Sequence, residues 1–435
     1  MDAPTDQITR ETVFSDINYA ESAETGIYSK LSEDGFASGT QVSVTFLAGL
    51  SGDDFNIHSN LPEYSQFYDN TLLPGNTTVS GLWNSCYKSI YSCNSVIQGL
   101  ENASFLDLSG KSRLLAEAKF LRAFSHFYLT TLYGDVPIVT TTSVDVTKSL
   151  PRDRQEDVFL QIERDLIEAR DILPESFDAY GGERIRATKY SASALLARLY
   201  LYKKDWPRAE AESTRIIDNK GQFSLLQNLN DVFLKNSKEA IWQLVPRLLD
   251  TREANVFIIR TTPNNASLSK ELFDSFDTND LRRSSWIGIY SSASDQFYFP
   301  NKYKTIGSSV LTEYSMVLRL SEQFLIRAEA RLNQNKLLGN EGAASDINRI
   351  RNRAGLVDTP ATTREDLFLE IVNQRRFELF SEWGHRWLDL KRLDLATIVL
   401  KPIKPYWTES SVIYPIPQYD IVNNSNLIQN YGYPN

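Results

Sequence analysis

Residues 114–139 read LLAEAKFLRAFSHFYLTTLYGDVPIV, and this segment constrains the fold more than any other part of the chain. Its apolar residues surround a helix expected over 112–133, so neighbouring elements must cover that helix on several sides. Gly134 can end the helix in a left-handed conformation, and Pro137 cannot continue it. The segment therefore predicts a helix inside a helical stack, followed by a sharp turn that Asp135 braces.

Further helices are expected on both sides of this one. Residues 82–102 carry apolar positions three and four apart, which predicts a helix that forms a hairpin with 112–133. Similar spacing predicts helices or helix pairs within 156–173, 188–203, 207–218, 319–355 and 363–394. Asp205 is the expected N-cap of the helix that begins near Pro207, in a turn typical of tetratricopeptide repeats. We therefore expect a mostly α fold, a tetratricopeptide-like α-solenoid of four helix pairs.

No segment reads as an inter-domain linker, so the chain is expected to form a single domain over residues 1–435. The expected parts are a helical scaffold (82–133, 156–218, 319–397), loop-rich excursions (37–81, 219–314) and an extended C-terminal segment (401–435). Within 219–314, the runs EAIWQLV, NVFIIR and QFYFP look like strands. Long ordered excursions on a rigid frame tend to carry function, so we place the candidate ligand sites there.

Composition and charge restrict the classes of function. The 435 residues carry a formal net charge of −9, which argues against a nucleic-acid partner, because such a surface is basic. The chain contains 7 Trp, 21 Tyr and 22 Phe residues, and exposed aromatic faces are surfaces on which sugar rings stack. Cys86 and Cys93 would lie roughly 10 Å apart along one helix, too far for a disulfide, so buried thiols are expected.

Several longer motifs resemble one known family. The motifs are EAKFLRAFSHFYLTTLYGDVPIV (117–139), LFDSFDTNDLRR (272–283), INRIRNRAGL (347–356), QRRFELFSEWGHRWLDLKR (374–392) and YPIPQYDIVNNSNLIQNYGY (414–433). Their order and spacing over nearly the whole chain resemble the SusD/RagB family of Bacteroidetes outer-membrane lipoproteins.

This resemblance implies a surface-exposed nutrient-binding protein that carries four tetratricopeptide units. Family members capture oligosaccharide, or peptide in some cases, and cap a SusC-like TonB-dependent transporter without doing chemistry. An N-terminal lipid anchor and outer-membrane location are implied by analogy, since no signal peptide or lipidated cysteine is visible in the sequence. The ligand residues vary between members, so the resemblance transfers none of them to this chain.

The first candidate binding segment is SGDDFNIHSNLPEYSQFYDN (51–70). Sugar recognition needs an aromatic face for the ring and short polar groups for the hydroxyls. This segment supplies Asp53, Asp54, Asn56, Tyr64 and Tyr68 as candidates. The alternatives are a solvated loop whose aromatic residues pack on the scaffold, or a calcium site, although the oxygen-bearing residues lack a full calcium-loop pattern. We therefore predict no metal or other cofactor.

The second candidate segment is RRSSWIGIYSSASDQFYFPNKY (282–303). Trp286, Tyr290 and Tyr298 lie among serines there, and a serine-rich loop is expected at the surface. Stacking of a ligand on Trp286 or Tyr290 is the functional hypothesis. Trp83 follows the first candidate segment and either faces the same pocket or packs in the core.

A hydrolytic enzyme is the alternative from another class. Glu378 and Glu382 are four residues apart and share a helix face, as a pair of catalytic carboxylates could. The interleaved arginines favour ion pairs instead. A hydrolase would require two carboxylates about 5 to 9.5 Å apart in a cleft, with Asp53 or Asp54 as the candidates. The preferred prediction is therefore capture of oligosaccharide without catalysis, with peptide as the alternative ligand.

Overall fold

The computed structural model describes residues 13–103, 108–293 and 295–434. Its α-helices are α2 (Ile17–Glu33), α3 (Val44–Ser51), α4 (Pro62–Asp69), α5 (Thr77–Glu101), α6 (Leu108–Tyr133), α7 (Val144–Thr147), α8 (Gln155–Ile172), α9 (Lys189–Tyr202), α10 (Trp206–Ile217), α11 (Arg252–Phe257), α12 (Lys270–Ser275), α13 (Leu281–Trp286), α14 (Leu320–Asn333), α15 (Ala343–Arg353), α16 (Arg364–Leu379), α17 (His385–Arg392), α18 (Ala396–Leu400) and α19 (Gln418–Asn423). Its strands are β1 (Phe55–Ile57), β2 (Ala240–Leu244), β3 (Ala266–Leu268), β4 (Ile287–Ser291), β5 (Gln296–Pro300) and β6 (Ser315–Arg319).

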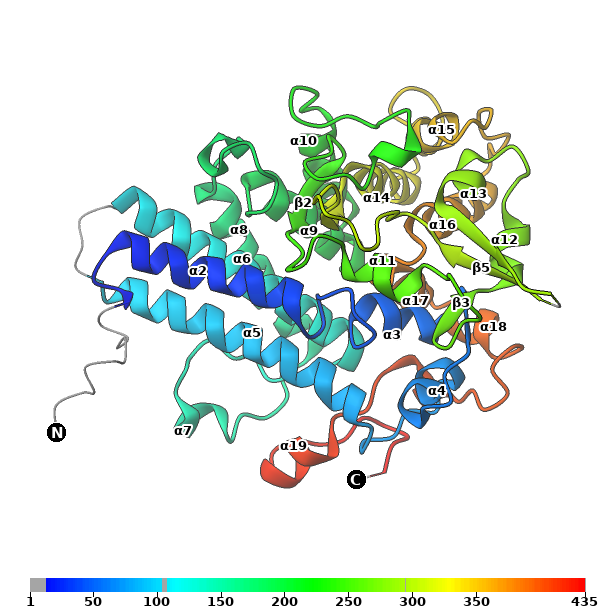
Figure 1. The fold of residues 1–435 in the computed structure, drawn as a ribbon. Coiled ribbons are helices and arrows are strands. Elements are labelled where there is room, and N and C mark those ends of the chain that lie inside the picture. Colours follow the sequence, from blue (N-terminus) through cyan, green and yellow to red (C-terminus); the bar gives the residue numbers. More distant parts are fainter. Residues whose placement is uncertain (1–12, 104–107, 294, 435) are drawn as a thin grey trace.

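The long helices pack one on the next through the molecule (Figure 1). Helix α5 packs on α6, α6 on α8, α8 on α9 and α9 on α10. The stack continues from α10 to α14, which contacts both α15 and α16. This arrangement confirms the predicted mostly helical, tetratricopeptide-like fold. It also provides a rigid frame for the excursions that the figure shows at its edges.

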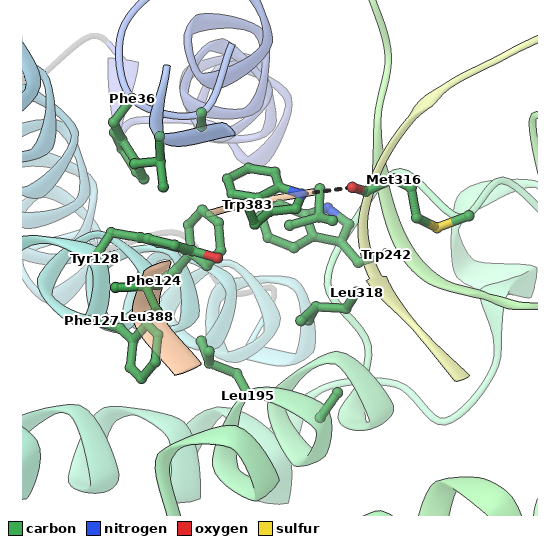
Figure 2. Close-up of a cluster of buried hydrophobic side chains, with 14 of the residues drawn as sticks. Phe36, Phe124, Phe127, Tyr128, Leu195, Trp242, Met316, Leu318, Trp383 and Leu388 are labelled. Atoms are coloured by element: carbon green, nitrogen blue, oxygen red, sulfur yellow. Dashed lines mark hydrogen bonds between the residues drawn. The ribbon is translucent and has the colours of Figure 1, made fainter. Parts of the chain in front are cut away.

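Helix α6 is the central helix of the core, as its apolar circumference predicted. Phe124 on this helix meets the indole rings of Trp242 and Trp383 at centroid distances of 5.1 and 5.4 Å. Figure 2 shows these rings together with Phe36 and Tyr128, and the Trp383 indole N–H donates to the carbonyl of Met316 at 2.7 Å. The buried cluster therefore ties the first helical pair to β2, β6 and the loop before α17.

The turn after α6 forms as predicted. Gly134 adopts a left-handed backbone (φ +75°), which a residue with a side chain rarely tolerates. The Asp135 carboxylate accepts a 2.9 Å hydrogen bond from the backbone N–H of Gln155, at the start of α8. The predicted N-cap of α10 is also confirmed, because the Asp205 side chain accepts from the backbone N–H of Arg208.

The excursions contain more helix than the sequence predicted. Residues 37–81 were expected to lack helical structure, but they contain α3 and α4. Helix α3 has no polar face because every one of its residues is buried, so its sequence shows no helical alternation. The run NVFIIR was predicted as a strand and instead starts with the end of α11, whereas EAIWQLV and QFYFP form β2 and β5 as predicted.

Two further features concern the membrane and the thiols. No helix within the described residues is long and apolar enough to cross a membrane. Cys86 and Cys93 are free and buried on α5, which confirms the prediction from their spacing.

Candidate functional site

Asp53 and Asp54 are not available to a ligand in the way the sequence suggested. Asp53 accepts 2.6 and 2.8 Å hydrogen bonds from Arg386, and the Arg376 guanidinium lies 3.0 Å away. Asp54 is buried and pairs with Arg376 at 2.8 Å. Burial raises the pKa of Asp54, whereas for Asp53 the effect of burial is outweighed by the hydrogen bond from Arg386 together with the charges of Arg376 and Arg386, so the pKa is lowered. Both carboxylates therefore anchor β1 to α16 and α17.

Trp286 was predicted as an exposed stacking residue, and this prediction is wrong. The side chain is 0% exposed, and its indole N–H donates to the carbonyl of Leu229 at 3.0 Å. The ammonium of Lys302 lies 4.9 Å from its ring centroid, in the geometry of a cation–π contact. Trp286 therefore supports the core beside a buried charge cluster rather than a ligand.

The remaining tyrosine candidates of the two segments also pack against protein groups. Tyr64 packs edge-on against Phe46 at 5.6 Å, and the Lys404 ammonium lies 3.9 Å from the Tyr68 ring centroid. Tyr298 is buried and stacks on a phenylalanine of α12 at 4.0 Å. Tyr64 and Tyr68 keep part of their surface exposed, but both rings pack against the hydrophobic core.

The two candidate segments meet in one four-stranded sheet with the strand order β1-β3-β5-β4 (right side of Figure 1). Asn56 on β1 lies opposite Ser267 on β3, and Tyr290 on β4 lies opposite Phe297 on β5. Residues directly opposite each other on antiparallel strands present their side chains on the same face. The Tyr290 and Phe297 rings stack with a centroid distance of 6.5 Å and an interplanar angle of 27°.

His58 connects these two cross-strand pairs. Its Nε2 atom lies 2.8 Å from the Ser267 hydroxyl, and its ring packs edge-on against Phe297 at 5.4 Å. Burial lowers the pKa of His58, so the imidazole is neutral at neutral pH. A neutral imidazole has one donor and one acceptor nitrogen, and since Nε2 is bonded to Ser267, only Nδ1 can serve a ligand hydroxyl.

We use the name sheet site for Asn56, His58, Tyr290 and Phe297, all of which remain partly exposed. The sheet site combines aromatic faces with an amide and an imidazole, the groups that sugar recognition requires. The candidates chosen from the sequence included Asn56 and Tyr290 but not His58 and Phe297, although both lie within the same two candidate segments. The alternation along QFYFP could have indicated that Phe297 and Tyr298 face opposite sides, whereas the pairing of β1 with β3 has no local signal.

Trp83, the last of the candidate residues, lies away from the sheet site. It is only 3% exposed and packs against Tyr87 with the two rings tilted by 60° and their centroids 5.0 Å apart. Both rings line a cavity of about 550 Å³ between α5, the segment after α6 and α19, and no residue of the sheet site lines this cavity. Of the two alternatives for Trp83, the structure therefore supports packing in the core and not a pocket shared with the two candidate segments.

The alternative catalytic pair, Glu378 and Glu382, belongs to a buried ion-pair cluster. Glu378 pairs with Arg319 at 2.6 Å and with Arg282 at 3.2 Å, while Glu382 pairs with Arg319 at 2.7 Å. Burial would raise the pKa of Glu378, but Arg353, Arg319 and Arg282 outweigh it and hold the pKa well below its usual range. These contacts confirm the predicted ion pairing.

No group of three or more His, Cys, Asp or Glu side chains in the described part of the chain is arranged to hold a metal ion. The calcium alternative rested on Asp53 and Asp54, whose carboxylates are bound to arginines.

The stacked helix pairs, with a four-stranded sheet attached to them, define a helical-repeat protein, and comparisons with known proteins identify its family. A family model described as "Starch-binding associating with outer membrane" matches residues 25–201, and the "SusD family" model matches residues 274–408. The chain belongs to the SusD/RagB family.

Individual relatives align with this chain over most of their length. SusD-like protein P2 of Formosa agariphila is 25% identical, with 98% of this chain and 94% of the relative aligned. Starch-binding protein SusD of Bacteroides thetaiotaomicron is 23% identical, with 74% of this chain and 73% of the relative aligned.

Solved structures share the fold. A SusD superfamily protein from Bacteroides vulgatus superposes with a TM-score of 0.84 at 20% identity, covering 97% of this chain and 100% of that one. A laminarin-binding SusD-like protein superposes with a TM-score of 0.77 at 24% identity, covering 96% of this chain and 99% of that one.

Proposed function

We propose that this chain captures oligosaccharide at the outer membrane and passes it to a SusC-like TonB-dependent transporter. Membership of the SusD/RagB family supports this proposal, and relatives named for starch and laminarin indicate a carbohydrate ligand. An N-terminal lipid anchor outside the described residues would hold the protein at the cell surface. The chain would bind and release its ligand without covalent chemistry.

The observation that carries the carbohydrate assignment is the composition of the sheet site. Tyr290 and Phe297 provide stacked aromatic surface, and Asn56 and His58 lie on strand β1 and directly after it. Their partial exposure suits a shallow site from which a sugar can leave quickly. Transfer to a transporter requires a dissociation constant in the micromolar to millimolar range, or about 4 to 8 kcal/mol of binding free energy.

The ion pairs of the carboxylates near the sheet site favour binding of a sugar over its hydrolysis. A glycoside hydrolase needs one carboxyl group that donates a proton and a second that attacks or activates water. Asp53 and Asp54, the two carboxylates that directly precede strand β1, both accept hydrogen bonds from arginine side chains. The same contacts make them structural supports of β1, which positions Asn56.

Affinity gel electrophoresis tests the ligand class. The chain would be run through native gels that contain laminarin, soluble starch or other soluble polysaccharides. We expect at least one glycan to retard the chain, and Tyr290→Ala to lose most of this retardation. Tyr19→Ala is the matched control, because Tyr19 is 54% exposed on α2, away from the sheet.

Circular dichroism of each variant would establish that the fold is intact. Retardation that Tyr290→Ala does not reduce would contradict the assignment to the sheet site. Retardation by no glycan, together with binding of short peptides in a separate titration, would instead favour the peptide alternative.

The transporter partnership has its own test. Affinity purification of the tagged chain from detergent-solubilised outer membranes of its natural host should enrich a TonB-dependent transporter. A preparation with intact, folded chain and no such transporter would contradict this part of the proposal.

A further inference from the structure

The cavity that contains Trp83 has the features of a binding site of its own. Its walls come from α5, from the segment between α6 and α8, and from α19 with the residues that follow it (lower part of Figure 1). The volume of about 550 Å³ falls in the range of ligand pockets in proteins. We call it the α5–α19 groove.

One wall of the groove is aromatic. Trp83, Tyr87 and Tyr91 occur at four-residue intervals on α5, so they lie along one face of the helix. The Tyr87 hydroxyl donates a 2.9 Å hydrogen bond to the carbonyl of Pro137, which fixes this ring in place. Tyr91 is 54% exposed, so a ring face at the mouth of the groove remains open to a ligand.

The opposite wall is polar. Asp420 on α19 lines the groove, and burial raises the pKa of its carboxyl group, an effect that a hydrogen bond with Trp83 partly offsets. Its Oδ2 atom is buried, and none of the described residues donates a hydrogen bond to it. The Asp420 side chain as a whole is only half-buried and lines the groove, so the part of its carboxylate that faces the groove can accept a hydrogen bond from a ligand hydroxyl. Asn423 and Asn424 lie next to it on the same wall.

The charges around the groove favour a neutral ligand. The groove is lined by two cations, Lys88 and Lys148, as well as by the carboxylate of Asp420. Lys148 already pairs with Asp145 at 2.8 Å. A cationic ligand at Asp420 would lie close to Lys88, and an anionic ligand would be repelled by Asp420. An uncharged molecule with hydroxyl donors and an apolar ring face avoids both penalties.

We propose that the α5–α19 groove is a second carbohydrate site, which binds one neutral sugar residue between Tyr91 and Asp420. The ligand class rests on the proposed function, but the site is separate from the sheet site and shares no residue with it. A sugar ring would stack on the aromatic wall while one of its hydroxyls donates to the Asp420 carboxylate. Two sites on one chain would let it hold a long glycan at two points and raise its retention.

Saturation-transfer difference NMR titrations with glucose, galactose, mannose and N-acetylglucosamine test this proposal. At least one sugar should bind the parent chain, with the affinity reduced about three- to tenfold in Tyr91→Ala, the loss expected for one stacked ring. Asp420→Asn should weaken the same sugar, because the amide replaces an accepting oxygen with a donor. Tyr290→Ala tests the sheet site in parallel, and Tyr19→Ala is the control with the same exposure as Tyr91.

Each outcome separates the two sites. Weaker binding in Tyr91→Ala with unchanged binding in Tyr290→Ala supports the groove, even if polysaccharide capture at the sheet site fails. Weaker binding only in Tyr290→Ala supports the sheet site and overturns the groove. Binding of no sugar, or affinity in Tyr91→Ala within about twofold of the parent, also overturns the groove.

Discussion

Glu253 provides a test of the electrostatics of the core. Its side chain is buried on α11, one oxygen accepts a hydrogen bond from the Ser315 hydroxyl, and no described residue donates to the Oε2 atom. Burial raises the pKa of Glu253 from 4.5 to about 7, although the hydrogen bond from Ser315 works in the opposite direction. Glutamine has nearly the same shape as glutamate but carries no charge. We therefore predict that Glu253→Gln is more stable relative to the parent chain at alkaline pH than at acidic pH.

The size of the effect follows from proton linkage. Between pH 4.5 and 7 the folded chain holds a proton on Glu253 that the unfolded chain releases. The stability of the parent therefore falls as the pH rises through this window, and the variant has no such loss. A pKa raised from 4.5 to about 7 corresponds to about 3 kcal/mol at pH values above both. The amide introduced in the variant costs about 1 kcal/mol if it lacks an acceptor, but this cost is the same at both pH values.

Urea unfolding followed by tryptophan fluorescence would measure this effect at about pH 5 and about pH 8.5. The free energy of unfolding of Glu253→Gln minus that of the parent should increase by about 2 to 3 kcal/mol from the lower to the higher pH. An equal difference at both pH values would refute the reasoning, because it would mean that the Glu253 carboxyl group ionises as readily in the folded chain as in the unfolded one.

Two further predictions concern buried groups. Glu378→Gln should lower the free energy of unfolding by about 3 to 5 kcal/mol, because it leaves Arg282, Arg319 and Arg353 without their shared anion. Glu365→Gln in the exposed first turn of the same helix should cost less than about 1 kcal/mol. Equal losses of stability in the two variants would contradict the stabilising role of the Glu378 ion pairs. Neither cysteine should react with Ellman's reagent in the folded chain, since burial raises the pKa of both thiols, and both should react in urea. Rapid reaction of a thiol before unfolding would contradict their burial.

The helical frame could be predicted because its signals are local. Long helices such as α6 and α8 repeat their apolar residues over several turns, and the Asp205 cap and Gly134 stop are visible in a few residues. Helix α3 has no such signal, because all eight of its residues are buried. The pairing of β1 with β3 joins residues more than 200 positions apart, and no local pattern specifies it.

The candidate site could be predicted only in part, for the same reason. Asp53 and Asp54 look free in the sequence because Arg376 and Arg386, their partners, lie more than 300 residues away. Trp286 lies in a serine-rich segment but is buried by groups from distant parts of the chain, among them Leu229 and Arg353. Residue type identified the chemistry, whereas the exposure of each side chain depended on tertiary packing.

A crystal structure with a bound oligosaccharide, cut from the glycan that retards the chain most strongly, is the decisive measurement for carbohydrate capture. The structure should show a sugar ring against Tyr290 or Phe297, with at least one of its hydroxyls hydrogen-bonded to Asn56 or His58. A sheet site left empty at saturating oligosaccharide, with the ligand bound elsewhere or not at all, would contradict the proposed site.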